Sequence, residues 1–286
     1  MQLKLYEAEG LDVRLLNLSG GAKSLEALFG GSADVVCGYF DHVIQMNAEG
    51  RKLKAFVTMQ RFPGLALVVS PTTQRRIESI AALKGAVIGV SSPGSATDLI
   101  LRYILLQHGI KPADFSVVGI GVSAGAVAAM ERGKVDAAMM GEPSISLLEK
   151  RAGSLRILVD TRSKDGLRQA LGVDHYPAAV LYSTEDWLRK NSASAASLSH
   201  ALEKTLRYLQ SSPQEAATKM PGEFQGDDPA SYAQVVQHAL AMYSPDGRMP
   251  DDGPGIVKKV LSTTLEKVRE SKLDLNASFT NQFLQH

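Results

Sequence analysis

The stretch SGGAKSLEALFGGSADVVC, residues 19–37, is echoed by GVSAGAVAAMERGKVDAAM, residues 121–139. Both stretches show a small-residue turn, a helical pattern, a G-x-x-D turn and the start of an apolar strand. At a fixed offset of 102 residues the aligned pairs are Ala22 and Ala124, Ala27 and Ala129, Leu28 and Met130, Gly31 and Gly133, and Asp34 and Asp136. Any two strand–helix–strand units share this outline, but we favour two similar α/β lobes. Ligands of open α/β sheets bind beyond the carboxyl ends of the strands, so two facing lobes would enclose one cleft.

Short apolar runs alternate with helical patterns over the first two thirds of the chain, which predicts an α/β fold with mostly parallel sheets. From Thr184 onward the pattern is helical. Strands are expected at 11–18, 33–38, 53–60, 65–70, 85–90, 115–122, 135–141, 155–160 and 178–183. Helices are expected at 24–31, 42–50, 96–109, 125–133, 185–191, 197–210, 229–243 and 255–270.

Composition excludes several classes of protein. The 286 residues suggest about two domains, and 44% hydrophobic with 21% charged residues is typical of a globular protein. Lys and Arg number 31 against 30 Asp and Glu, so no bulk charge favours nucleic acid. Cys37 is the only cysteine, and the histidines and acidic residues lack metal-ligand spacing, so we predict no disulfide and no metal site. No apolar run approaches the roughly 18 residues that span a bilayer, and the start, MQLKLYEAEG, lacks the features of a signal peptide.

Two enzyme motifs overlap at residues 119–125. GVSAG matches the nucleophile elbow of serine hydrolases, with Ser123 as nucleophile and His175, His200 or His238 as possible bases. No HGGG-type oxyanion segment accompanies it. The dinucleotide pattern G-x-G-x-x-A also fits, at Gly119, Gly121 and Ala124, but Asp136 comes too early for its acid and Pro143 follows the alternative, Glu142. A tight glycine turn explains both matches, so neither enzyme class is favoured.

The segment SSPGSATD, residues 91–98, precedes the strongest helical pattern. Ser95 and Asp98 form an S-x-x-D capping box there. The same helix start, with its free N–H groups and small hydroxyls, would also bind an anion. SGGAKS, residues 19–24, occupies the corresponding place in the first lobe, while GYFDH (38–42) and GEPS (141–144) form the loops after the echoed strands.

These segments together resemble a known family. GLDVRL, SGGAKSLEALFGGSADVV, ALKGAVIGVSSPGSATDLILRYILLQHGI and AMERGKVDAAMMGEPSISLL, in this order and spacing, are similar to periplasmic solute-binding proteins of nitrate/sulfonate/taurine-type ABC transporters, the SsuA/THI5-like or NMT1-like family. The resemblance extends from about residue 3 to about 185.

The resemblance implies a two-lobed type II periplasmic-binding-protein fold with two crossover strands and a helical C-terminal segment. Lobe I would comprise residues 1–64 and 182–286, and lobe II residues 65–181. The family's first strand has no counterpart in this sequence, because LKLYEAEGLDV resembles the end of the first helix and the second strand. The residues expected to contact the solute are Ser19, Gly20, Gly21, Ala22, Tyr39, Asp41, His42, Ser91, Ser92, Gly94, Ser95, Ala96, Thr97 and Glu142.

The resulting prediction is a periplasmic, monomeric receptor without catalytic residues or cofactor, which binds a small anionic or heteroaromatic solute and delivers it to a membrane permease. Two alternatives remain open. One is an enzyme: either a thiamine-pyrimidine synthase of the same fold or a serine hydrolase using Ser123. The presence of a single cysteine, Cys37, argues against the synthase. The other is a sensor domain that binds a ligand without transport.

Overall fold

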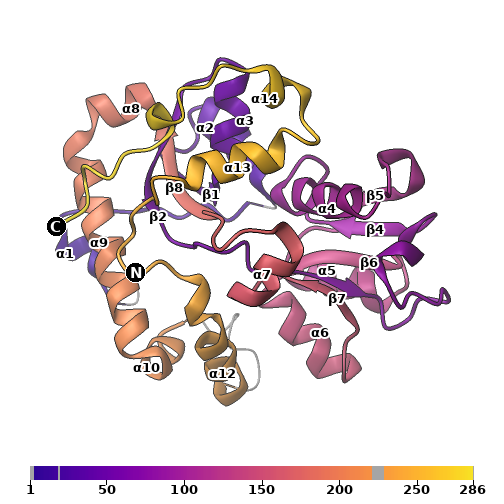
Figure 1. Cartoon of the computed structure of the whole chain (residues 1–286). Helices are drawn as coiled ribbons and strands as arrows, with labels where there is room; N and C mark the ends of the chain where they lie inside the picture. The colour runs from indigo at the N-terminus through magenta and orange to yellow at the C-terminus, as the bar shows by residue number, and fades with distance from the viewer. Residues whose placement is uncertain (1–2, 19, 221–228, 286) are drawn as a thin grey trace.

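The strands of the computed structural model, which describes residues 3–18, 20–220 and 229–285, form two separate sheets (Figure 1). The first sheet has the order β1-β8-β2, and the second the order β5-β4-β6-β3-β7. The strands are β1 Val36–Tyr39, β2 Leu53–Thr58, β3 Leu65–Val69, β4 Val87–Val90, β5 Ser116–Gly119, β6 Ala137–Gly141, β7 Ile157–Asp160 and β8 Ala179–Thr184. The two-sheet α/β fold is the one that the resemblance implied.

The prediction of mostly parallel sheets is wrong for the first sheet. There β8 pairs antiparallel with both β1 and β2. In the second sheet β4 is parallel to β5 and β6, whereas β3 is antiparallel to β6 and β7. The reason is that β3 and β8 each enter a sheet by crossing from the other sheet, and each becomes the antiparallel partner of two strands.

Residues 11–18 were expected to form a strand, and this prediction is wrong. No described strand pairs with this segment, and it has no regular secondary structure. Leu15, Leu16 and Leu18 are 55%, 43% and 41% exposed. An alternating apolar segment becomes a strand only when a neighbour satisfies its backbone groups, and no described segment does so here.

Each expected helix is present within a few residues, but the one expected at 255–270 is divided by residues 262–265. The helices at 5–8, 144–152, 164–171 and 213–218 were not expected. The α-helices are α1 Leu5–Ala8, α2 Gly21–Phe29, α3 Phe40–Ala48, α4 Ala96–Gln107, α5 Ala124–Glu131, α6 Ser144–Ala152, α7 Lys164–Leu171, α8 Glu185–Lys190, α9 Ser192–Ser211, α10 Pro213–Thr218, α12 Pro229–Ala239, α13 Gly253–Leu261 and α14 Glu266–Glu270. Of the C-terminal helices, α9 contacts β2, and α13 and α14 contact α3, so they cover the first sheet (Figure 1). No helix in the described ranges is both long enough and apolar enough to span a membrane.

The chain crosses between the sheets twice, at residues 59–64 and 172–178, and the two crossings are hydrogen-bonded to each other. The Tyr176 N–H donates to the Arg61 carbonyl at 2.7 Å, and the Ala178 N–H donates to the Gln60 carbonyl at 2.8 Å. The predicted lobe boundary at 64/65 falls at the start of β3. The one at 181/182 falls inside β8, which lies wholly in the first sheet. We therefore propose that lobe II ends before Ala179.

Leu67 and Leu15 provide a matched test of where the core lies. Leu67 is fully buried in β3, between β6 and β7, whereas Leu15 is mostly exposed. Leu67→Ala should lower the free energy of unfolding by about 2–5 kcal/mol through lost burial and a cavity, and Leu15→Ala by no more than about 0.5 kcal/mol. Urea denaturation of the two variants measures both values. Equal losses would contradict the assignment of residues 11–18 to the surface.

Candidate functional site

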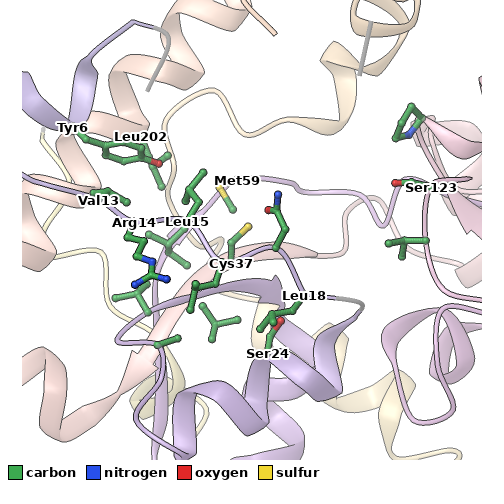
Figure 2. Close-up of a pocket in the computed structure, with 18 of the residues that line it drawn as sticks. Tyr6, Val13, Arg14, Leu15, Leu18, Ser24, Cys37, Met59, Ser123 and Leu202 are labelled. Carbon is green, nitrogen blue, oxygen red and sulfur yellow. The ribbon is translucent and has the colours of Figure 1, made fainter. Parts of the chain in front are cut away.

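A cavity of about 2190 Å³ opens between the first sheet and the loops of the second (Figure 2). Its first wall consists of residues 11–18 and of residues 32–37, which lead into β1. Its second wall consists of Val122, Ser123 and Ala124 at the start of α5 and of residues around the start of α6. None of the predicted site residues that the structure describes lines this cavity. Ser24 of α2 lines the cavity, and it lies two residues after the predicted segment at 20–22.

Ser123 has an unusual backbone conformation on the second wall of the cavity. Its φ of 53° and ψ of −127° are strained for a residue other than glycine, and its side chain is exposed to the cavity. Strain of this kind is concentrated at functional sites, and here it places the residue at the N-terminus of α5. Of the candidate bases, His175 contacts Asp252 at 2.8 Å and His200 lies 3.6 Å from Glu9. His238 has no described side chain.

The predicted residues of the two lobes meet around the N-terminus of α2, in a group that we call the polar seam: Gly20, Gly21, His42 and Ser92. A Cβ atom on Gly20 would lie 3.4 Å from the Ser92 Oγ, and one on Gly21 would lie 2.0 Å from the His42 Cε1. Gly20 has φ 146° and ψ 170°, a backbone conformation that only glycine adopts readily. The two glycines therefore allow α2 to begin directly against the imidazole ring and the serine hydroxyl. Ala22 follows in the first turn of α2, and Ser19 lies outside the described residues.

Three buried polar atoms of the polar seam have no hydrogen-bond partner among the described residues: His42 Nδ1, His42 Nε2 and Ser92 Oγ. Burial lowers the pKa of His42 from 6.5 to about 4, so its ring is neutral at pH 7 and offers one donor and one acceptor. An unsatisfied buried polar group costs about 1–3 kcal/mol. A bound molecule that supplied both a donor and an acceptor would satisfy these atoms.

Tyr39 and Asp41, both predicted to contact solute, bond to the two crossings, while Asp41 Oδ2 has no hydrogen-bond partner among the described residues. The Tyr39 hydroxyl donates to the Pro63 carbonyl at 2.6 Å in the first crossing. The Tyr176 hydroxyl in the second crossing donates to Asp41 Oδ1. Burial raises the pKa of Asp41 from 3.8 to about 7, although the bond from Tyr176 opposes this shift. These side chains thus hold the start of α3 against both crossings.

The loop at 91–97 satisfies most of its own polar groups. The Ser91 hydroxyl donates to the Ser95 Oγ at 2.9 Å, and Thr97 Oγ1 lies 3.0 Å from Ser91 Oγ and 2.8 Å from Ser95 Oγ. Ser92 is therefore the hydroxyl of this loop that is left for a ligand. Gly94 is exposed, and Ala96 is buried at the start of α4.

The predicted capping box between Ser95 and Asp98 is wrong. The Asp98 carboxylate accepts from the Gly94 N–H at 2.8 Å and from Arg102 at 2.6 Å, while the Ser95 side chain makes no capping bond. The Ser95 hydroxyl bonds to the neighbouring hydroxyls of Ser91 and Thr97 and not to a backbone N–H of α4.

Glu142 is held by a partner that the sequence did not reveal. Its Oε1 accepts from Arg162 at 2.7 Å, and its Oε2 accepts from the Ser146 N–H at 3.1 Å, close to the start of α6. Arg162 also binds Asp160, and the two acidic residues raise its pKa. Arg162 follows β7, so its position after a predicted strand was the one sequence signal that could have identified it as a site residue. Within the described ranges, no three His, Cys, Asp or Glu side chains gather as a metal site would require.

Gly21→Ala tests the contact between α2 and His42. The added methyl group would collide with the buried imidazole, so we expect a loss of about 1–3 kcal/mol in the free energy of unfolding. The loss should shrink when His42→Ala is present, because the ring is then absent. Gly255→Ala in α13 is the matched control, since a Cβ there meets nothing within 4 Å. Additive effects of the two substitutions at the seam would refute the contact.

Asp41→Asn tests the buried carboxyl. Between its unfolded pKa of 3.8 and its folded pKa of about 7, the native protein retains a proton that the unfolded chain releases, so stability falls as pH rises through this window. His42, with a lowered pKa, has the opposite effect below about pH 6.5, so the contribution of Asp41 stands alone above that value.

We expect Asp41→Asn to abolish the loss of stability between roughly pH 6.5 and 8 and to be more stable than the natural chain at pH 8, by at most about 4 kcal/mol. Denaturation at a series of pH values measures this. The exposed Asp251, changed to Asn, is the control and should keep the slope. A retained slope in Asp41→Asn would contradict the assignment.

Comparisons with known proteins agree with the fold and the sequence resemblance. A protein of known structure from Bordetella bronchiseptica RB50 is 34% identical, with a TM-score of 0.93, over 99% of this chain and 88% of that one. The alkanesulfonate-binding protein SsuA of Xanthomonas axonopodis pv. citri, bound to MOPS, is 18% identical with a TM-score of 0.78 over 98% of this chain and 92% of that one. The periplasmic nitrate-binding protein NrtA of Synechocystis PCC 6803 is 13% identical with a TM-score of 0.73, over 99% of this chain and 82% of that one.

The family model described as NMT1/THI5-like matches residues 2–216, about three quarters of the chain. The chain belongs to the NMT1/THI5-like family.

Proposed function

We propose that this protein is the solute-binding receptor of an ABC importer. The observation that carries the proposal is the polar seam, where buried and unpartnered polar atoms from the two lobes face the N-terminus of α2. Membership of the NMT1/THI5-like family supports it, as do structural neighbours described as sulfonate- and nitrate-binding proteins. A periplasmic location, a monomeric state and a permease partner belong to the same proposal.

The proposed solute is a small anionic or heteroaromatic molecule. One end of the solute would accept hydrogen bonds from the backbone N–H groups at the start of α2 and from the Ser92 hydroxyl. It would also form a hydrogen bond with the His42 ring. A helix N-terminus contributes only about 0.3–1 kcal/mol, whereas micromolar binding requires about 8 kcal/mol. The hydrogen bonds of the seam and apolar burial in the adjoining cavity must supply the remainder.

The predicted contact residues divide by role in this proposal. Gly20, Gly21, Ala22, His42 and Ser92 contact the solute. Ser91, Gly94, Ser95, Ala96 and Thr97 shape the loop that presents Ser92, and Tyr39, Asp41 and Glu142 position neighbouring segments.

One observation favours an enzyme as the second candidate. The strained backbone at Ser123 has the form that a nucleophile elbow requires, and Ser123 lines the cavity. A hydrolase would need a base within hydrogen-bond reach of the hydroxyl. Neither His175 nor His200 lines the cavity that Ser123 lines, and they contact Asp252 and Glu9.

Thermal unfolding with a panel of sulfonates, nitrate, bicarbonate, aromatic acids and pyrimidines tests the receptor. We expect one solute to raise the melting temperature by several degrees through preferential binding to the folded state. Ser92→Ala should weaken that solute about tenfold, the effect of losing one hydrogen bond of roughly 1.4 kcal/mol. Ser123→Ala is the matched control and should retain the affinity. Ester hydrolysis that Ser123→Ala abolishes would establish the enzyme instead, and stabilisation that Ser92→Ala leaves unchanged would remove the seam from the site.

A further inference from the structure

The first crossing is hydrogen-bonded to a third segment of the chain as well as to the second crossing. The Arg61 N–H donates to the Met242 carbonyl at 2.8 Å, and the Ser244 N–H donates to the Met59 carbonyl at 2.8 Å. The segment 242–244 therefore takes part in the connection between the two sheets, although it comes long after both crossings in the chain.

α12 is fastened to this connection. It ends at Ala239, and the 3₁₀ helix Leu240–Met242 follows it directly. The last residue of that helix supplies the carbonyl that accepts from Arg61. Because one turn of 3₁₀ helix separates α12 from the first crossing, a change of angle between the lobes at the crossing also moves α12 relative to the second lobe. In Figure 1, α12 lies at the bottom of the view, between α10 and α6 of the second lobe.

Tyr232, in the first turn of α12, approaches the second lobe. It is partly buried and lines the same cavity as Pro143 and Ser144. Burial, the Tyr243 hydroxyl and the Glu142 carboxylate together raise the pKa of Tyr232 to about 12. Its hydroxyl is therefore protonated at neutral pH and can donate a hydrogen bond. Tyr232 thus lies within electrostatic reach of Tyr243 beside the first crossing and of Glu142 in the second lobe.

Glu142 is able to accept that bond. Its Oε1 accepts from Arg162 and its Oε2 from the Ser146 N–H, so the carboxylate is held in one position. Each carboxylate oxygen has two lone pairs, and one on each oxygen remains for a further donor. A hydrogen bond from a phenol to a carboxylate is charge-assisted and stronger than one between neutral groups.

We propose that Tyr232 is a positioning residue of the solute site: when the lobes close over the solute, its hydroxyl donates to Glu142 and fastens the second lobe to α12. The proposal rests on the proposed function, since it concerns closure over a bound solute. A bond that exists only in the closed form slows the release of the solute more than its entry. An aromatic ring that merely lined the cavity would not require the hydroxyl, and this difference can be tested.

Cross-linking tests the approach of α12 to the second lobe without any solute. The full chain carries Tyr232→Cys and Glu142→Cys, together with Cys37→Ala so that the two introduced thiols are the only ones. The probe is a short bis-maleimide, and intact mass reports the cross-link. The matched control replaces Tyr232→Cys with Gln237→Cys, because Gln237 is exposed on α12 and bonds to Gln214 of α10.

We expect the pair at 232 and 142 to cross-link at least about tenfold faster than the control pair, after correction for the reactivity of each thiol with a monofunctional maleimide. A minor closed population is sufficient, because the cross-link traps it. Equal rates for the two pairs would overturn the proposal, whether or not a solute binds.

Tyr232→Phe, which removes only the hydroxyl, tests the bond itself. With the solute that raises the melting temperature, stopped-flow measurement should show release about tenfold faster and association unchanged. Combining Tyr232→Phe with Glu142→Ala should add little to the effect of Glu142→Ala alone, because both changes remove the same bond. Gln237→Ala is the control and should keep both rates. Unchanged release from Tyr232→Phe would refute the bond and leave the receptor standing. If no solute of the panel binds, the proposed function fails, and the cross-linking rates alone decide whether α12 meets the second lobe.

Discussion

The hydrogen-bonded pair of crossings, residues 59–64 and 172–178, is the constraint on which the other features depend. It holds the two sheets together, and Tyr39 and Asp41 fasten the start of α3 to it. His42 is the residue of α3 that follows Asp41, so the imidazole of the polar seam is positioned by the same contacts. The connection between the sheets and the proposed solute site are thus built from consecutive residues.

Burial of Asp41 and His42 has a shared electrostatic consequence. Burial displaces each pKa toward the neutral form of its group, so at pH 7 His42 is neutral and Asp41 is about half protonated. This suits a chain with a formal net charge of +1, which has no strong overall field to attract an anion. Preference for a particular solute must therefore come from the direction of individual N–H and O–H groups.

The sequence was informative where chemistry is local and much less so where partners are distant. Strands such as β3 and helices such as α4 follow from apolar periodicity and glycine or proline ends, and the repeat predicted two sheets. The predicted strand ranges could not show that no described strand pairs with residues 11–18. For the site, residue types at 91–97 placed the start of α4 correctly, whereas α2 begins at Gly21, before the start expected at residue 24. The bonds of Asp41 to Tyr176 and of Glu142 to Arg162 join residues far apart in the chain, and no local pattern carries them.

The strand order also governs the sequence of assembly. β1 and β2 do not pair with each other, and in the described part of the chain the strand that joins them is β8, the last strand there. During synthesis the first sheet therefore cannot form until the whole second sheet, from β3 to β7, has been made. The second sheet is complete within one continuous segment and can fold first. β1 and β2 therefore stay unpaired until β8 has been synthesised, and only then can the first sheet form.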